Sequence, residues 1–338
     1  MAREDYEKKR VTIYQVAKEA GYSLATVSRV INDKDNVTEE TKRVVNAVIE
    51  KLGYKPSAIA QGLAKSKSTN IGIVIPSSMY TYVASMLSGL VEIAKIYGYQ
   101  TTLFVTSQIQ QEASEVVEKV ISSNVDGAVI YDDQLSDEDI AKLANYSIPV
   151  AVIGREIEGN NVASIPLLYG DSIKKAVKKH FDNGDEDIVF LHINNGGALM
   201  NNLERICQEE CEKLNRSTNF KVIAVEDSYS KTYAQFLDYF RNGGKKAFFI
   251  APRDSISCGV TNAAIETGFK IPEEVQIMSV IGTKYSMIAR PSLTSLDIDM
   301  YEVGSIAMRM LTKLLNSTLK NRTFPFKSTI NIRKSTRN

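Results

Sequence analysis

Apolar and polar residues follow two different rhythms along the chain. Up to about residue 56, single apolar positions recur every three or four residues, which is the spacing of amphipathic helices. From Asn70 onward, continuous apolar runs are separated by helical patterns such as Val83–Ile96 and Ala113–Ile121. The pattern predicts a small helical N-terminal part and a larger part in which strands and helices alternate.

Three short helices are predicted in the N-terminal part. The first begins at a capping box of Thr12 and Gln15 and ends at Gly21, which suits a left-handed C-terminal stop. The second lies within Ser23–Asn32, and the third runs from about Thr38 to Gly53. Their expected buried positions are Ile13, Val16, Ala17, Ala20, Val27, Val30, Ile31, Val44, Val45, Val48 and Leu52.

The larger part has the pattern of an α/β protein with two similar halves. Apolar runs "IGIVIP", "TTLFVT", "DGAVIY" and "PVAVIG" alternate with helices, and the alternation restarts at Ser172 with "DIVFLH", "KVIAVE", "AFFIA" and "QIMSVIG". Continuous apolar strands between amphipathic helices indicate a parallel sheet covered on both faces. Two doubly wound units in tandem leave a cleft at the carboxyl ends of their strands, where ligands usually bind.

Composition narrows the class of protein. Of 338 residues, 43% are apolar and 24% are charged, as in an ordinary globular protein with a substantial core. No apolar run is long enough to span a bilayer, and the charged start "MAREDYEKKR" leads into no hydrophobic segment, so neither a membrane span nor a secretory signal is expected. Cys207, Cys211 and Cys258 do not have the spacing of a zinc site or disulfide framework, and three free thiols suit a reducing cytoplasm.

The sequence contains few motifs that would indicate an enzyme. The sequence has no glycine-rich phosphate loop, no metal-ligand cluster and no nucleophile elbow, so no cofactor is expected. His192 at a predicted strand end could act as a base, but a structural role is favoured. A solute-binding receptor shares the tandem architecture, but the N-terminal helices and the missing signal argue against it.

The helix at Ser23–Asn32 carries the strongest functional signal. Its sequence "SLATVSRVIN" combines small polar residues and one arginine, Arg29, and it follows another helix after a tight turn, as in a helix-turn-helix DNA reader. Arg29 can reach guanine O6 and N7 in the major groove. Residues 1–70 hold 13 Lys and Arg against 9 Asp and Glu, which is weak support for a polyanionic partner. The alternative is a plain three-helix bundle with a polar face.

The segment after the third helix has the sequence of a short helix that forms only when a partner is bound. The sequence "PSAIAQGLAKSKST" has about two turns of helical pattern followed by a polar linker. A helix this short is unstable alone in water because nucleation is unfavourable. We therefore expect this segment to need a partner to order it.

The N-terminal sequence "VTIYQVAKEAGYSLATVSRVINDKDNVTEETKRVVNAVIEKLGYKPSAIAQGLA" resembles the DNA-binding region of the lactose/galactose repressor family. Later segments agree with the same family: "GYQTTLF", "VDGAVI", "IPVAVIGRE", "RDSISCGV", "GFKIPEEV" and "RPSLTS". The resemblance implies a dimeric, sequence-specific transcription regulator. It also implies four parts: a head over 1–56, a hinge over 57–69, one core subdomain over 70–165 and 294–325, and a second over 166–293 and 326–338.

The resemblance assigns DNA contacts residue by residue. Phosphate contacts are implied for Thr12, Ser23, Thr26, Ser28 and Asn32, base-edge contacts for Leu24, Ala25 and Arg29, and a further contact for Tyr14. In the family's hinge helix, here about Ser57–Ala64, Leu63 beside Ala60 would wedge into a minor-groove base step. Pairing of two such hinges requires a dimer and a pseudo-palindromic operator. Taken alone, Leu63 is equally a packing residue of a linker helix.

The sugar site of the family is only partly present. Ile281 occupies the place of an expected Asp, Leu168 replaces another, and Gln208 replaces a Gly three residues after Arg205. A sugar is therefore not expected as the primary effector, because its hydroxyl groups would lack carboxylate partners. Residues that still suit the cleft are Ser77, Tyr80, Arg155, Arg205 and Asp254, although the last three fit structural pairs equally well.

A C-terminal helix resembles a docking surface in the branch of the family that governs carbon catabolite genes. The sequences "MYEVGSIAMRMLTKLLN" and "KSTR" carry this likeness. In that branch the helix docks a serine-phosphorylated, histidine-containing phosphocarrier protein as co-repressor, with an arginine on the phosphoserine. The implied contacts are Tyr301, Glu302, Ser305, Met308, Arg309 and Lys313. Two alternatives stay open: a solvated amphipathic helix without a partner, and a local repressor that answers to a small molecule.

Overall fold

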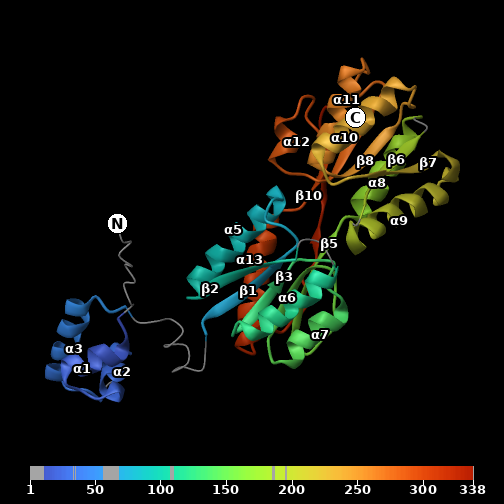
Figure 1. The fold of residues 1–338 in the computed structure, drawn as a ribbon. Helices are drawn as coiled ribbons and strands as arrows, with labels where there is room; N and C mark the ends of the chain where they lie inside the picture. Colours follow the sequence, from blue (N-terminus) through green and yellow to red (C-terminus); the bar gives the residue numbers. More distant parts are fainter. Residues whose placement is uncertain are drawn as a thin grey trace, which may run out of the picture. The chain divides into compact units, whose positions relative to one another are not determined.

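The computed structural model describes residues 11–32, 34, 36–55, 68–106, 110–184, 187–194 and 196–337, without the side chains of 110–113. The chain forms two compact units, Met1–Thr69 and Asn70–Asn338, which we call the head and the core (Figure 1). Among the described residues, no helix combines the length and apolar character that a membrane span requires.

Three helices build the described part of the head, as predicted: α1 (Ile13–Ala20), α2 (Leu24–Ile31) and α3 (Glu39–Leu52). At the start of α1, the Gln15 side chain accepts a hydrogen bond from the Thr12 backbone N–H at 2.8 Å. The helix ends at Gly21, whose φ of 71° confirms the left-handed stop. The head has its own small apolar core, formed by Val16, Ala17, Val27, Val30, Val45 and Tyr54.

The core contains two sheets. The first has the order β11-β5-β4-β3-β1-β2 and the second the order β12-β10-β9-β8-β6-β7. Strands of the first sheet are β1 (Asn70–Ile75), β2 (Gln100–Val105), β3 (Gly127–Ile130), β4 (Val150–Gly154), β5 (Val162–Leu168) and β11 (Phe326–Lys327). Those of the second are β6 (Ile188–Ile193), β7 (Phe220–Val225), β8 (Phe248–Arg253), β9 (Gln276–Ile281), β10 (Thr294–Asp297) and β12 (Thr329–Asn331).

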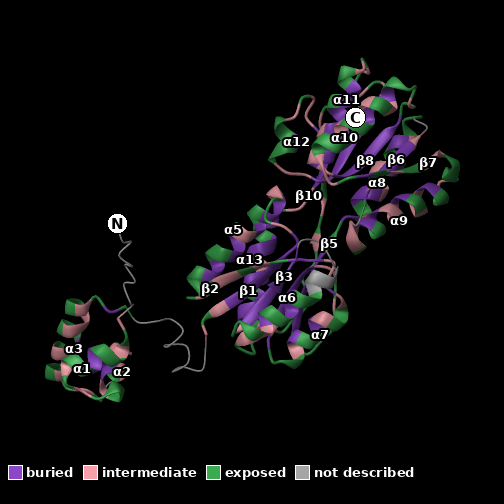
Figure 2. Cartoon of the chain, in the orientation of Figure 1, coloured by how far each residue is buried: buried purple, intermediate pink, exposed green. Residues whose placement is uncertain are grey.

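Helices cover both faces of each sheet, as the α/β pattern predicted (Figure 1). Those of the first half are α5 (Thr81–Ile96), α6 (Gln110–Ser122), α7 (Asp137–Asn145) and α13 (Met300–Leu315). Those of the second are α8 (Gly170–Asp182), α9 (Gly197–Lys213), the short 3₁₀ helix η1 (Ser217–Asn219), α10 (Tyr229–Arg241), α11 (Asp254–Glu266) and α12 (Lys284–Ile288). Central strands are buried throughout and the outer helix faces are exposed (Figure 2).

The chain crosses between the sheets at places that differ from the expected boundaries. Strand β5 continues to Leu168 in the first sheet, beyond the expected boundary at 165. Strand β10 pairs with β9 in the second sheet, so residues 294–297 do not belong to the first subdomain. Strand β11 pairs with β5, which places 326–327 in the first sheet. We therefore define the N-lobe as residues 70–168 and 298–327, and the C-lobe as 169–297 and 328–337.

Helices α5 and α13 pack side by side on the N-lobe sheet (Figure 1). A Cβ atom on Gly89 would overlap the carbonyl oxygen of Tyr301, and one on Gly304 would overlap that of Met86. The two glycines therefore let the helix backbones approach closely. This close crossing decides which face of α13 remains accessible.

Candidate functional site

Helix α2 presents a polar face to the outside of the head. Ser23 caps the helix, and its hydroxyl oxygen accepts a hydrogen bond from the Thr26 backbone N–H at 3.1 Å. Val27 and Val30 are buried in the head core, which turns Leu24, Ala25 and Arg29 outward. Arg29 has no ion pair within the described part of the chain. Its guanidinium is therefore available to an external partner.

The other residues predicted for DNA contact are placed as follows. Thr12, Tyr14 and Ser23 are exposed, Thr26, Ser28 and Asn32 are half-buried, and the Asn32 amide donates to the Ser28 carbonyl oxygen at 2.8 Å. Ser57, Ala60 and Leu63 of the expected hinge lie outside the described residues.

The prediction that Ser305 and Met308 of α13 contact a docked protein is wrong. Ser305 is 3% exposed and Met308 is 0% exposed, so neither can contact a partner on the surface. Helix α5 covers Ser305, because the Ser305 hydroxyl oxygen lies only 2.8 Å from the place that a Cβ on Gly89 would take. Tyr301, Ser305, Arg309 and Lys313 recur every four residues in the sequence, but this spacing does not reveal where a second helix covers the face.

The remaining α13 residues form an exposed group of Tyr301, Glu302, Arg309 and Lys313. The Tyr301 hydroxyl donates a hydrogen bond to Glu92 Oε2 of α5 at 2.6 Å, and this bond raises the Tyr301 pKa. Arg309 and Lys313 have no carboxylate partner among the residues that the structure describes. This group, which we call the α13 surface, carries two unpaired cations.

A cavity of about 270 Å³ lies between the two lobes of the core. Its walls are largely apolar, with polar side chains from both lobes. The N-lobe contributes Pro76, Tyr82, Tyr131, Asp132, Asp133, Gln134, Ile153, Gly154, Arg155 and Leu167, and the C-lobe contributes Gly196, Ala198, Leu199, Met200, Asn202, Leu203, Pro252, Arg253 and Ile281. We call it the interlobe cavity.

Only one of the five predicted cleft residues lines the interlobe cavity. This residue is Arg155, whose guanidinium donates to the carbonyl oxygen of Leu135 at 2.5 Å. Arg205 is exposed and pairs with Glu209 at 2.5 Å. Ser77 accepts a hydrogen bond from the Met79 N–H at 3.2 Å and lies outside the lining.

Asp254 is also displaced from the cavity. It is buried at the start of α11, where it accepts a hydrogen bond from the Thr283 N–H at 3.1 Å. Burial raises its pKa, and the hydrogen bonds from Thr283 oppose that rise. Its neighbour Arg253, which the sequence analysis did not select, lines the cavity instead.

Tyr80 joins the lobes beside the interlobe cavity. Its hydroxyl donates to Asp227 Oδ2 of the C-lobe at 2.6 Å, and the Arg253 guanidinium lies 4.0 Å from the centre of its ring. Arg253 also pairs with Asp227. Burial is the main cause that raises the pKa of Tyr80 to about 12. These contacts form a polar bridge from the loop before α5 to the ends of β7 and β8.

A second contact between the lobes involves α9. The Asp133 carboxylate accepts a hydrogen bond from the Leu199 N–H at 3.1 Å, in the first turn of that helix. A carboxylate at a helix N-terminus is stabilised by the helix dipole. A Cβ on Gly197 would overlap this carboxylate, so the approach depends on glycine.

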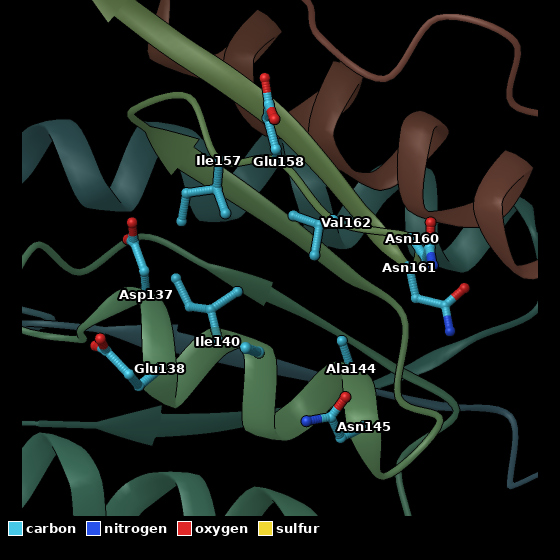
Figure 3. A pocket seen from close by; sticks show the side chains of 12 residues that line it. Asp137, Glu138, Ile140, Ala144, Asn145, Ile157, Glu158, Asn160, Asn161 and Val162 are labelled. Carbon is cyan, nitrogen blue, oxygen red and sulfur yellow. The ribbon is translucent and has the colours of Figure 1, made fainter.

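An open groove of about 560 Å³ lies elsewhere on the N-lobe, between α7 and the connection from β4 to β5. Ile140, Ile157 and Val162 extend toward one another across it, with Asp137 and Glu138 on the α7 side (Figure 3). None of the predicted site residues lines this groove.

Comparison with known proteins supports the division into head and core. Residues 12–57 match the model of bacterial regulatory proteins of the lacI family, and residues 179–336 match a periplasmic binding protein-like domain. The chain is 30% identical over 314 residues to catabolite control protein A of Priestia megaterium, covering 90% of this chain and 93% of that protein. The chain belongs to the lacI family of bacterial regulatory proteins.

Other relatives agree with this assignment. The HTH-type transcriptional regulator pepR1 of Lactobacillus delbrueckii subsp. lactis is 30% identical over 309 residues, with 91% of this chain and 92% of that protein covered. The lac repressor dimer bound to operator and an anti-inducer has the same fold, with a TM-score of 0.81 at 20% identity over 97% of this chain and 99% of that chain. The transcription regulator CcpA of Lactococcus lactis gives a TM-score of 0.67 at 24% identity over 79% of this chain and 99% of that chain.

As a member of the lacI family, the protein is a DNA-binding transcription regulator and not an enzyme. Its half-buried His192 contacts the Glu204 carboxylate at 2.5 Å, a pairing that suits a structural role. Within the described ranges, no three His, Cys, Asp or Glu side chains gather as a metal site would require.

Proposed function

We propose that this lacI-family regulator acts in the cytoplasm as a dimer on a pseudo-palindromic operator. Each head places α2 in the major groove, and the two hinges, residues 57–64, enter the minor groove together with Leu63 as the wedge. The exposed face of α2 is the observation that carries the proposal: Leu24, Ala25 and Arg29 project from a helix whose opposite side is buried. The DNA backbone is contacted by Thr12, Tyr14, Ser23, Thr26, Ser28 and Asn32. In the hinge, Ser57 and Ala60 join Leu63 in the contact with the minor groove.

Exposed apolar residues of the core support a dimer. In the N-lobe, Val91, Ile96 and Tyr97 of the α5 end and Leu103 and Val105 of edge strand β2 are exposed. In the C-lobe, Tyr285, Met287 and Ile288 of α12 are exposed as well. Large apolar side chains that gather on a surface are typical of interfaces between proteins.

The proposed regulation is carbon catabolite control with a serine-phosphorylated phosphocarrier protein as co-repressor. The α13 surface supports this, because Arg309 and Lys313 are exposed cations without carboxylate partners among the described residues, and arginine binds phosphate bidentately. The name catabolite control protein A, borne by a relative at 30% identity, points the same way. Tyr301 and Glu302 would flank the phosphoserine contact.

Two binding measurements test the proposal. DNA fragments are first selected from a random pool with the purified protein, and a two-fold symmetric consensus is expected. Affinity for that consensus is then measured with the carrier in its phosphorylated and unphosphorylated forms. A monomeric protein without sequence preference contradicts the operator proposal, and equal affinities with both carrier forms contradict the co-repressor proposal.

A second candidate is a local regulator controlled by a small molecule. The interlobe cavity favours it, because the cavity opens between two lobes whose relative position a ligand can change. A ligand in this cavity changes the affinity for the operator only if it binds one arrangement of the two lobes more tightly than another. Such coupling typically amounts to about 1–3 kcal/mol.

A further inference from the structure

Buried phenol groups are the distinctive feature of the interlobe cavity. Tyr82 is 8% exposed and Tyr131 is 9% exposed, and both line the cavity. Their rings meet edge to face with centroids 6.2 Å apart. Neither hydroxyl has a hydrogen-bond partner among the residues that the structure describes. Burial raises the pKa of both phenols, so each hydroxyl keeps its proton and remains a donor at neutral pH.

Arg253 adds a positive charge beside these two donors. Its side chain is 12% exposed, and it uses Nη1 to bind Asp227. No hydrogen bond from its Nη2 or Nε is found within the described residues. The charge of Arg253 also acts on Tyr82 and on Tyr131, where it opposes the rise in pKa caused by burial. One wall of the cavity therefore has several N–H and O–H donors that have no acceptor within the described residues.

The two carboxylates that line the cavity each accept hydrogen bonds from the protein. Asp132 accepts hydrogen bonds from the Thr106 hydroxyl and, at 2.9 Å, from the Gln134 N–H. Asp133 accepts from the Leu199 N–H at 3.1 Å. Around Tyr82, Tyr131 and Arg253 the free hydrogen-bonding groups are therefore donors, which can bind a ligand that brings acceptors.

Much of the remaining wall is apolar. Pro76, Ile153, Leu167, Met200 and Ile281 line the cavity with apolar surface. Sugar hydroxyl groups need polar partners on all sides, whereas these side chains offer none. An apolar ligand body can instead fill the cavity at no cost in lost hydrogen bonds.

We infer that the interlobe cavity binds a small monocarboxylate with an apolar body, whose carboxylate accepts hydrogen bonds from Tyr82, Tyr131 and Arg253. The binding of the ligand does not depend on the proposed function. Only its effect on operator binding rests on that function. The carboxylate would sit on the donor wall, and the apolar body would lie against Ile153, Met200 and Ile281. Its acceptors would bind both phenols and the N–H groups of Arg253 that do not contact Asp227.

Calorimetric titration of the full-length protein without DNA tests this ligand class. The probes are phenylacetate, benzoate and hexanoate, with phenylacetamide and 2-phenylethanol as neutral counterparts and glucose, glucose 6-phosphate and inorganic phosphate as polar alternatives. Phenylacetate is expected to bind at least about tenfold more tightly than phenylacetamide, since hydrogen bonds to a charged acceptor are stronger than those to a neutral one. Failure of all three carboxylates to bind at millimolar concentration overturns the inference, as does tighter binding of a sugar.

Two matched variants locate the site. Tyr82→Phe and Tyr131→Phe each remove one hydroxyl that has no partner in the described structure, so both should fold normally by circular dichroism and each should weaken carboxylate binding about tenfold. Tyr146→Phe, on an exposed residue directly after α7, is the control and should bind like the parent protein. Unchanged carboxylate affinity in both cavity variants overturns the assignment.

Operator binding, measured separately, keeps the two proposals distinguishable. A protein that binds its operator but no carboxylate refutes the ligand inference alone. A protein that binds carboxylates but prefers no DNA sequence refutes the proposed function alone.

Discussion

The head and the interlobe cavity place their polar side chains in opposite ways, the first on an exposed face and the second in a buried space. The head displays its polar groups on the outside of one short helix, and each side chain keeps its place because Val27 and Val30 anchor the other side. The interlobe cavity collects its polar groups from strand ends and loops of both lobes, and buries them. The head surface therefore depends on the stability of a small core, whereas the cavity depends on how two lobes are held together.

The largest effect is expected from a charge placed in the head core. Val27→Asp buries an unpaired carboxylate among Val16, Val30 and Val45, which should destabilise the head by about 3–5 kcal/mol and abolish specific DNA binding. Because head and core are separate compact units, the melting transition of the core should stay unchanged. Differential scanning calorimetry and a gel-shift assay check both points.

Ala47→Asp is the matched control for this charge, because Ala47 is exposed on α3. It should leave head stability nearly unchanged. If Val27→Asp also lowers the melting temperature of the core, the two units do not fold independently and the comparison fails.

A smaller and more selective effect is expected from Arg29→Ala. Truncation of an exposed side chain leaves the head folded, but loss of a bidentate contact to guanine should remove about 1–3 kcal/mol of discrimination at one base pair of each half-site. Competition binding with single-base operator variants measures this loss. Arg241→Ala, which removes the same charge from an exposed site of the C-lobe, should change no base preference. Equal losses at every base pair would mean that Arg29 contacts phosphate instead.

This difference in plan explains which site residues the sequence could predict. The α2 face is contiguous in sequence, so helical periodicity alone separates Val27 and Val30 from Leu24 and Arg29. The cavity residues lie on segments that come together only in the fold. Nothing in the local pattern distinguishes Arg253, which lines the cavity, from Asp254, which turns to Thr283.

The fold shows the same division between local and non-local information. Eight strands were predictable from continuous apolar runs, whereas β5, β10, β11 and β12 were missed. The last three have only 4, 2 and 3 residues, which carry too little pattern. The burial of Ser305 and Met308 was also missed. It follows from the crossing of α5 and α13 at Gly89 and Gly304, which helical spacing does not encode.

Tyr80→Phe tests how the lobes around the cavity are held. The variant keeps the ring beside Arg253 but removes the hydrogen bond to Asp227, which should lower core stability by about 1–2 kcal/mol. The pKa of Tyr80 is raised above its ordinary value of 10.0 to about 12. Its contribution is therefore fully present below pH 10 and is lost as the pH rises through 12.

Thermal melts of the core between pH 8 and pH 11 would measure this contribution. The difference between parent and Tyr80→Phe should be constant up to the ordinary tyrosine pKa and then shrink. Tyr146→Phe should follow the parent throughout, because the ring of Tyr146 is exposed at the end of α7. A Tyr80→Phe core as stable as the parent would show that the lobes do not need this bridge.

The smallest effect is expected from the exposed ion pair that joins α1 and α3 of the head. Lys51 Nζ lies 2.7 Å from Glu19 Oε1, and the hydrogen bond from Lys51 lowers the Glu19 pKa. A lowered carboxyl pKa means that the contribution is present above the ordinary value of 4.5 and fades as the pH falls below it. Solvent and salt screen such a pair, so Lys51→Met should leave the melting temperature of the head unchanged within error. Val45→Ala, in the head core, should lower it clearly. A large fall in the melting temperature with Lys51→Met that disappears in high salt would contradict this. It would mean that surface charge, and not the buried valines, stabilises the head.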